Sequence, residues 1–184
     1  MITPKTEPAQ NVTLISSEEL STLQLSVLAD DIAETLRQYR PEFKLLIKLH
    51  RLSGCRVKEL FQPTRWQVAS TSEVKVQPQK RNALRTLRFI DIGFRDAEAF
   101  TAVLADMARL PYRQYERAFS AVVHEKNLWR LYNDGFAIPS THLFRHVKIK
   151  ELSLQGQTDD QIARWIGEKS VENIGYYLAS RFFQ

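Results

Sequence analysis

Apolar residues recur at helical spacing along most of this 184-residue chain, and they switch to every second position only between Trp66 and Ile92. This switch constrains the fold most, because a period of two is typical of strands and a period near 3.6 is typical of helices. The exceptional segment contains W-x-V, V-K-V and T-L-R-F-I-D, with residues 77–85 at a hairpin tip. The sequence therefore predicts an α+β fold, mainly α with a small antiparallel β-sheet.

The start and stop signals of helices divide the remainder of the chain. We expect the first helix to begin after Ser16 or Ser17, with Leu20, Leu23 and Val27 on its apolar side. A capping box at Thr158 predicts the start of the helix Ile162 to Ile166. The other predicted helices are Pro41 to Ser53, Arg56 to Phe61, Asp96 to Met107, Tyr112 to Leu131, Ser140 or Thr141 to Leu154, and Ser170 to Phe182.

The length suits one domain with a real core. We expect residues 1–15 to form a flexible lead-in and residues 16–184 to form a single globular domain. No apolar run approaches the length that spans a membrane, and the N-terminus lacks the pattern of a signal peptide. The single cysteine, Cys55, cannot form an internal disulfide. These features predict a cytoplasmic protein without a membrane partner.

Positive charge is concentrated in one third of the chain. Residues 37–95 hold 14 Lys and Arg against 4 Asp and Glu, whereas residues 1–36 carry a net charge of −5. A local excess of positive charge attracts polyanions such as nucleic acid. A solvated face that only keeps the protein soluble explains the same charge equally well.

Three segments carry residues suited to chemistry. Arg56 follows a tight corner in S-G-C-R-V-K-E-L, and Tyr176 and Tyr177 form a pair in W-I-G-E-K-S-V-E-N-I-G-Y-Y-L. In T-H-L-F-R-H, the spacing i, i+3, i+4 places His142, Arg145 and His146 on one face of a helix. A guanidinium fork with imidazole donors suits an oxyanion. Two histidines at i, i+4 also suit zinc, but the metalloprotease pattern needs Glu at the position of Leu143, which favours phosphate.

These motifs, in this order, resemble the catalytic domain of the tyrosine recombinase or phage integrase family. That family has T/S-G-x-R-x-x-E-L, a lysine on a β-hairpin, H-x-x-R-H, a G-H or G-W pair, and a tyrosine nine residues beyond that pair's second member. The matching positions here are residues 53–60 with Arg56, then Lys80, then 142–146, then Gly167-Glu168, then Tyr177. The resemblance covers nearly the whole chain, and its spacing selects Tyr177 over Tyr176.

The resemblance implies cleavage and rejoining of DNA strands through a 3′-phosphotyrosyl intermediate, with no cofactor and no metal. The catalytic residues that it implies are Arg56, Lys80, His142, Arg145 and Tyr177. We expect His146, Glu168 and Lys169 as possible accessory residues and Lys58, Lys75, Arg81 and Arg85 as DNA contacts. The implied partner is double-stranded DNA, on which four protomers assemble from monomers, so the protein is expected with the nucleoid.

Two departures from the family leave alternatives open. Glu168 stands where the family has His or Trp, and a carboxylate repels a phosphate unless it is protonated or turned away. A catalytically weakened relative that binds or regulates DNA is therefore the second hypothesis, and a type IB topoisomerase shares the same residues. Family members also carry an N-terminal DNA-clamping domain, which we do not expect in residues 1–184, so the chain is either a catalytic fragment or a compact natural form.

Overall fold

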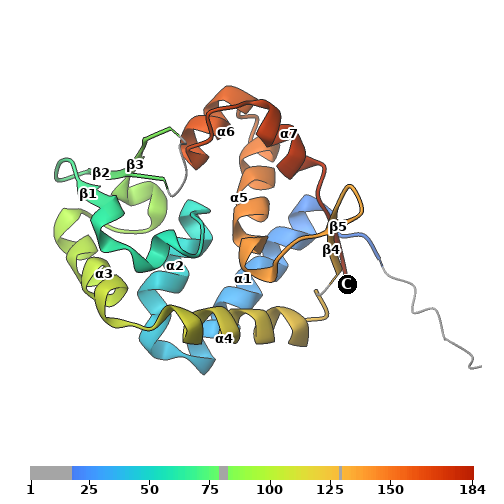
Figure 1. Cartoon of the computed structure of the whole chain (residues 1–184), viewed down its shortest axis with the longest axis horizontal. Coiled ribbons are helices and arrows are strands. Elements are labelled where there is room, and N and C mark those ends of the chain that lie inside the picture. Colours follow the sequence, from blue (N-terminus) through green and yellow to red (C-terminus); the bar gives the residue numbers. More distant parts are fainter. Residues whose placement is uncertain (1–17, 79–82, 129) are drawn as a thin grey trace, which may run out of the picture.

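The computed structural model describes residues 18–78, 83–128 and 130–184, in which helices surround a central helix and two small antiparallel sheets lie on opposite sides (Figure 1). The helices are α1 (Thr22–Tyr39), α2 (Lys44–Ser53), α3 (Ala97–Arg109), α4 (Tyr112–Glu125), α5 (Leu143–Leu154), α6 (Asp159–Ile166) and α7 (Glu172–Leu178). The strands are β1 (Trp66–Val68), β2 (Glu73–Val76), β3 (Arg85–Arg88), β4 (Arg130–Asn133), β5 (Phe136–Ala137) and β6 (Arg181–Phe183). Short 3₁₀ helices are η1 (Pro41–Phe43), η2 (Glu59–Phe61), η3 (Pro63–Arg65), η4 (Phe89–Ile92) and η5 (Ser140–His142). The predicted α+β class is confirmed.

The first sheet has the order β1-β2-β3 and corresponds to the segment with a period of two. Val74 faces Leu87 across the β2–β3 pair, and both are buried, while Lys75, the next residue of β2, is exposed. This alternation is what a sheet with one face on the core requires. The end of the segment differs from the prediction, because Phe89–Ile92 form a 3₁₀ helix after the last strand.

The second sheet, β5-β4-β6, was not predicted. The expected helix from Tyr112 to Leu131 ends at Glu125, because Asn127 adopts a left-handed conformation with φ of 59° and turns the chain into β4. The expected helix to Phe182 ends at Leu178, and β6 then pairs with β4. Both helix predictions were therefore too long. Strands of two to four residues are too short to show a period of their own.

Helix α1 begins later than predicted and buries a different face. Ser21 is its N-cap and forms a capping box with Gln24, while the expected caps Ser16 and Ser17 lie outside the described residues, as does the predicted lead-in. Leu23 and Val27 are 67% and 71% exposed. The buried face is instead made by Leu25, Ala29, Ile32, Ala33 and Leu36. The prediction chose the wrong one of two apolar stripes.

Helix α5 is the centre of the fold and packs against α1, α2, α6 and α7. Its N-terminal half contributes Leu143, Phe144 and Val147 to the main core, and its C-terminal half packs Ile149 and Leu152 into a smaller cluster under α6 and α7. Two side chains of α5 are charged or titratable but buried in this arrangement, Arg145 and His146. A buried guanidinium requires partners from neighbouring elements.

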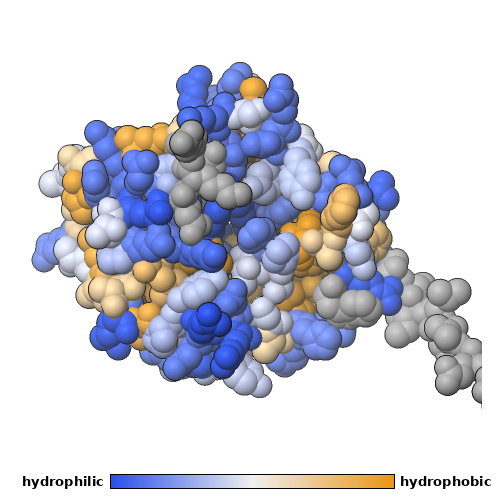
Figure 2. Space-filling model, viewed as in Figure 1, coloured by the Kyte–Doolittle hydropathy of each residue, from blue (hydrophilic) through white to orange (hydrophobic). Residues whose placement is uncertain are grey.

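The surface of the molecule, seen in the orientation of Figure 1, is largely hydrophilic (Figure 2). Hydrophilic residues predominate around α6 and α7, and hydrophobic residues form scattered patches (Figure 2). Within residues 18–78, 83–128 and 130–184, no helix is long and apolar enough to cross a membrane.

Two short segments next to the candidate site differ from the predicted helices. Residues Arg56 to Phe61 form a turn followed by η2, so Arg56 precedes the helical turn instead of starting a helix. His142 ends η5, and α5 begins one residue later at Leu143. Arg56 therefore lies shortly before η2, and His142 lies immediately before α5.

Candidate active site

Arg145 is the anchor of the site. Its side chain projects from α5 and is almost fully buried, at 1% exposure. Its Nη1 donates to the carbonyl oxygen of Gly54 at 3.1 Å, its Nη2 donates to Glu168 at 2.7 Å, and its Nε donates to the hydroxyl oxygen of Tyr177 at 3.0 Å. Bonds on all three nitrogens fix the orientation of a planar guanidinium. The buried Arg145 thereby joins the loop after α2, the loop after α6 and helix α7.

Arg56 approaches the same point from the loop after α2. This helix ends at Gly54, which has φ of +63°, and a Cβ there would lie 2.9 Å from Cβ of Lys148. Glycine is therefore required both for the left-handed conformation and for the close approach of α5. Beyond this corner, Arg56 Nη2 donates to Glu168 at 2.8 Å.

Glu168 receives both arginines on one oxygen. Its Oε1 accepts from Arg56 and Arg145, the Tyr177 hydroxyl lies 3.4 Å from the same atom, and Asn173 donates to Oε2 at 3.2 Å. Burial alone raises the pKa of the Glu168 carboxyl, but the charges and hydrogen bonds of the arginines more than offset this and hold the pKa below its usual 4.5. The carboxylate is therefore ionised at neutral pH.

Tyr177 is the tyrosine that faces the arginines. It lies on α7, with the Arg145 guanidinium carbon 5.3 Å from the centre of its ring. Tyr176 is 50% exposed, and its ring stands at 82° to that of Tyr177. Successive helix positions differ by about 100° in direction. Tyr177, and not its neighbour, is therefore the tyrosine in contact with Arg145.

The two histidines of the H-x-x-R-H motif occupy different places. His146 is buried with its ring centre 4.8 Å from that of Tyr177, and burial together with the charge of His142 lowers the pKa of His146 to about 3. This histidine is therefore neutral and packs behind the tyrosine. His142 is partly buried at the end of η5, and its charge also acts on His50.

Arg85 does not fit the expectation of a DNA contact. It is 2% exposed, its Nη2 lies 3.2 Å from Glu59, and its Nη1 donates to the carbonyl oxygens of Trp165 and Ile166. A strand position at a hairpin tip predicted exposure, but α6 covers this end of β3. Arg85 therefore braces the site from inside.

Glu59 is a further residue of the site to which the sequence assigned no role. It is 2% exposed, pairs with Arg85, lies 3.6 Å from Arg56 Nη1, and accepts a bond from the backbone N–H of Arg56 at 3.0 Å. The R-x-x-E spacing was the available signal, since it places an acid beside the arginine. Three guanidinium groups and two carboxylates meet here, which leaves a net charge of +1: Arg56, Arg85 and Arg145 with Glu59 and Glu168.

The remaining predicted residues lie around the site or outside the described residues. Lys58 and Lys169 are exposed next to Arg56 and Glu168, and Lys75 is exposed on β2. Lys80 and Arg81 fall in residues 79–82, which lie outside the described residues. Among the residues that the structure describes, no group of three His, Cys, Asp or Glu is placed to hold a metal ion.

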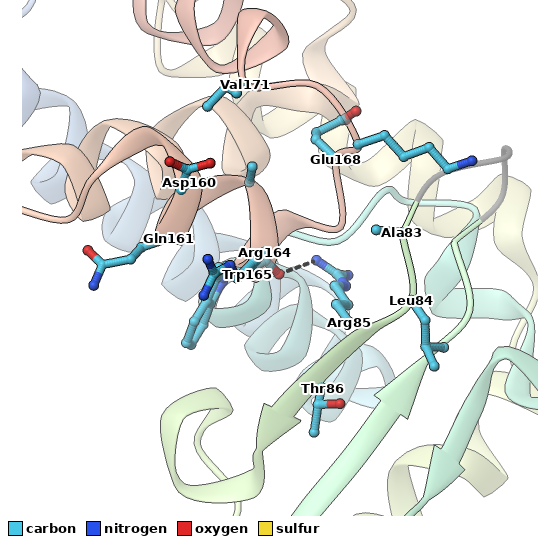
Figure 3. A pocket seen from close by; sticks show the side chains of 12 residues that line it. Ala83, Leu84, Arg85, Thr86, Asp160, Gln161, Arg164, Trp165, Glu168 and Val171 are labelled. Atoms are coloured by element: carbon cyan, nitrogen blue, oxygen red, sulfur yellow. Dashed lines mark hydrogen bonds between the residues drawn. The ribbon is translucent and has the colours of Figure 1, made fainter.

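A cavity of 610 Å³ adjoins the cluster between β3 and α6. Figure 3 shows Glu168, Ala83 and Arg85 toward one end of it and Asp160 and Gln161 at the other. Arg164 and Lys169 also line it. The site is therefore open to solvent on a side that carries additional positive charge.

Comparison with solved structures identifies the fold. The structure is similar to a lambda integrase (75–356) dimer bound to a COC′ core site, with a TM-score of 0.60 and 16% identity over 87% of this chain and 58% of that chain. It is also similar to XerA recombinase, with a TM-score of 0.54 and 15% identity over 81% of this chain and 57% of that chain. XerH recombinase bound to difH gives a TM-score of 0.54 and 13% identity over 86% of this chain and 49% of that chain.

The chain therefore has the catalytic-domain fold of the tyrosine recombinases. It spans about half to three fifths of the length of these solved chains. No protein-family model matches the sequence. A search of curated proteins finds no match either.

Proposed function

We propose that this chain cleaves and rejoins duplex DNA, with the hydroxyl of Tyr177 as the nucleophile and the guanidinium groups of Arg56 and Arg145 as the binding site of the scissile phosphate. The observation that carries the proposal is a convergence. Both guanidinium groups donate to one oxygen atom, and one of them also donates to the tyrosine hydroxyl at 3.0 Å. An anion at that oxygen's position lies within reach of the hydroxyl.

The proposed step is an in-line displacement at phosphorus. The bond from the Tyr177 oxygen to phosphorus forms as the bond from phosphorus to the 5′ oxygen breaks, giving a 3′-phosphotyrosyl link and a free 5′-hydroxyl. The tyrosine loses one proton and the leaving oxygen gains one, so no proton is consumed overall. A 5′-hydroxyl of a partner strand reverses the step. Because the link keeps the energy of the broken bond, the reaction needs no ATP.

The residues contribute by neutralising charge and moving protons. Arg56 and Arg145 stabilise the negative charge that develops in the transition state, and His142 donates a further hydrogen bond. Lys80 is the proposed acid that protonates the leaving oxygen. Lys58 and Lys75 are proposed contacts with the DNA backbone, and Lys169 is a proposed accessory donor. Exchange between two duplexes brings four protomers together on DNA.

Covalent trapping on DNA of random sequence tests the proposal, because it needs no chosen target site. In a pool of nicked duplexes, cleavage near a nick releases the short fragment that carries the free 5′-hydroxyl, so that the adduct cannot be resealed. We expect wild type to leave DNA linked to protein that survives denaturation, and the linked DNA can be sequenced. Tyr177→Phe should yield no adduct, while the matched control Tyr176→Phe should retain it. An adduct that survives in Tyr177→Phe, or none in wild type on any sequence, rejects the proposal.

The position of Glu168 favours a second candidate, a relative that binds DNA but cleaves it poorly. Its carboxylate already occupies the two arginines. This candidate predicts sequence-selective DNA binding by wild type without any adduct. Relaxation of supercoiled plasmid without site preference would instead indicate a topoisomerase.

A further inference from the structure

The two arginines of the proposed phosphate site are already occupied by an anion from the chain itself. Oε1 of Glu168 lies 2.8 Å from Arg56 Nη2 and 2.7 Å from Arg145 Nη2, distances typical of charge-assisted hydrogen bonds. The same atom lies 3.4 Å from the Tyr177 hydroxyl. One carboxylate oxygen therefore has the three contacts that a phosphate oxygen needs at the start of the proposed reaction.

A phosphate cannot be added to this arrangement without a rearrangement. Arg145 Nε and Nη1 are bonded to Tyr177 and Gly54, and Nη2 is shared between Glu168 and the carbonyl oxygen of Ile166. The Nη1 atom of Arg56 is buried and has no hydrogen-bond partner among the described residues. Arg145 thus has few donors to spare, whereas Arg56 Nη1 is still free to donate. A second anion at hydrogen-bond distance from the carboxylate would nevertheless be repelled by it.

We propose that Glu168 is an internal occupant of the phosphate site, which DNA must displace before Tyr177 can react. This inference rests on the proposed function, because it concerns the same two arginines. The displaced carboxylate has a place to go. Glu168 lines the cavity between β3 and α6, and Arg164 and Lys169 line the same cavity (Figure 3). Rotation of the Glu168 side chain exchanges the buried Arg145 and the partly buried Arg56 for solvent and these more exposed cations.

This arrangement makes cleavage conditional. An isolated phosphate competes with a tethered carboxylate and binds weakly, whereas a duplex held by several further contacts supplies the free energy to expel it. Glu168 therefore protects DNA that is bound only loosely. It also keeps Arg56 and Arg145 paired when DNA is absent, which avoids the repulsion of neighbouring uncompensated charges.

Binding of inorganic sulfate tests the inference without DNA. Glu168→Gln keeps the size of the side chain and removes its charge, so we expect it to bind sulfate roughly tenfold more tightly than wild type by calorimetry. The matched control is Glu172→Gln. Glu172 is exposed in the first turn of α7 and its side chain bonds to Ser170, so this variant removes the same charge without touching the arginines. We expect its sulfate affinity to stay within about twofold of wild type.

A second variant keeps the test decisive if Glu168→Gln does not fold. Glu168→Asp retains the negative charge but withdraws it by one methylene from the arginines, and it too should bind sulfate more tightly than wild type. If neither variant exceeds wild type, or if Glu172→Gln gains as much, the inference is wrong. Since no DNA is cleaved in this assay, a failure here leaves the trapping result for Tyr177 untouched, and a failure of trapping leaves the sulfate result untouched.

Discussion

Two buried arginines belong to the packed helices α2 and α5, and their guanidinium groups pair with carboxylates in different ways. Arg51 of α2 donates from Nε to Asp30 at 2.9 Å and from Nη1 and Nη2 to both oxygens of Glu151 on α5. Arg145 of α5 is equally buried, but its partners are a carboxylate shared with a second arginine and a tyrosine hydroxyl. Arg51 fastens three helices together, because Asp30 belongs to α1.

The difference lies in what the partners can do. The fork of Arg51 is filled by a carboxylate that pairs with no second arginine among the described residues and accepts otherwise from the Ser26 hydroxyl, which suits a fixed structural link. Around Arg145, one carboxylate oxygen serves two arginines, one donor of Arg56 is left without a hydrogen bond among the described residues, and a cavity adjoins. Burial of charge therefore does not distinguish the two clusters. Shared and incomplete pairing beside a tyrosine hydroxyl does, and it is found at the proposed site.

The largest effect is expected when each of the two arginines is replaced by lysine, which has no guanidinium fork. Arg145→Lys cannot bond to Gly54, Glu168 and Tyr177 together, so we expect the rate of adduct formation to fall by about 10³-fold. Arg51→Lys should change that rate by less than about threefold, because Arg51 contacts no proposed site residue. Rates on a trapped nicked duplex decide this, and equal losses in the two variants would mean that both clusters act only through the fold.

The next largest effect concerns stability at the structural cluster. Arg51→Met leaves Glu151, whose side chain is 15% exposed, without its buried partner, and we expect unfolding in urea to become easier by about 3 kcal/mol. The double variant Arg51→Met, Glu151→Leu should recover most of this loss, because no unpaired charge remains. A single variant as stable as wild type would show that Glu151 finds water or another partner.

The dependence of stability on pH tests whether a buried histidine next to each arginine, His50 beside Arg51 and His146 beside Arg145, is neutral in the folded protein. Burial, followed by the charge of His142, lowers the pKa of both His50 and His146 to about 3 from the usual 6.5. The unfolded chain then binds more protons than the folded one between these values, so stability is full above pH 6.5 and falls as the pH drops toward 3.

Each histidine should contribute a slope of ~1.4 kcal/mol per pH unit within that window. His50→Gln should remove one such contribution between pH 4.5 and 6.5, and so should His146→Gln. The control His124→Gln changes an exposed residue of α4 and should leave the slope as in wild type. Urea unfolding at several pH values measures this, and an unchanged slope in His50→Gln would contradict the buried neutral state.

The smallest expected effect concerns the exposed lysines at the rim. Lys58→Ala should lower duplex affinity only a few fold and reduce the slope of log affinity against log salt by about 1, since one phosphate contact is lost. Lys44, exposed at the other end of α2, provides the control, because Lys44→Ala should leave the salt slope unchanged. Fluorescence anisotropy over a series of salt concentrations separates the two, and identical slopes would remove Lys58 from the proposed interface.

The sequence predicted the parts of this site that depend on order and spacing. Arg56, Arg145 and Tyr177 meet in space as their motifs suggested, and the α+β class is confirmed. The sequence did not predict equally well which side chains are buried and which are exposed. Arg85 was expected at the surface because a hairpin strand is usually exposed, yet α6 covers it. Which carboxylate would reach the arginines also depended on how the loop after Gly167 folds back, which no local pattern encodes.

The ends of the helices were also hard to predict from the sequence. Helices α4 and α7 were predicted too long because the strands that follow them are too short to show a period of their own. Strand pairing between residues as distant as Arg130 and Phe183 is a tertiary event. Local propensity could not reveal it.

Helix α7 has only seven residues, fewer than an isolated helix needs to persist in water. Contacts with neighbouring elements must therefore hold α7 in place. The side chain of Asn133 donates to the carbonyl of Tyr176, and four residues after Tyr177 the chain enters β6. The Phe182 carbonyl of β6 accepts from the Leu20 backbone, and the backbone N–H of Gln184 donates to the carbonyl of Glu18. The strand that follows Tyr177 is thus held by backbone hydrogen bonds to residues 18–20. The placement of Tyr177 therefore depends on a segment more than 150 residues away in the sequence.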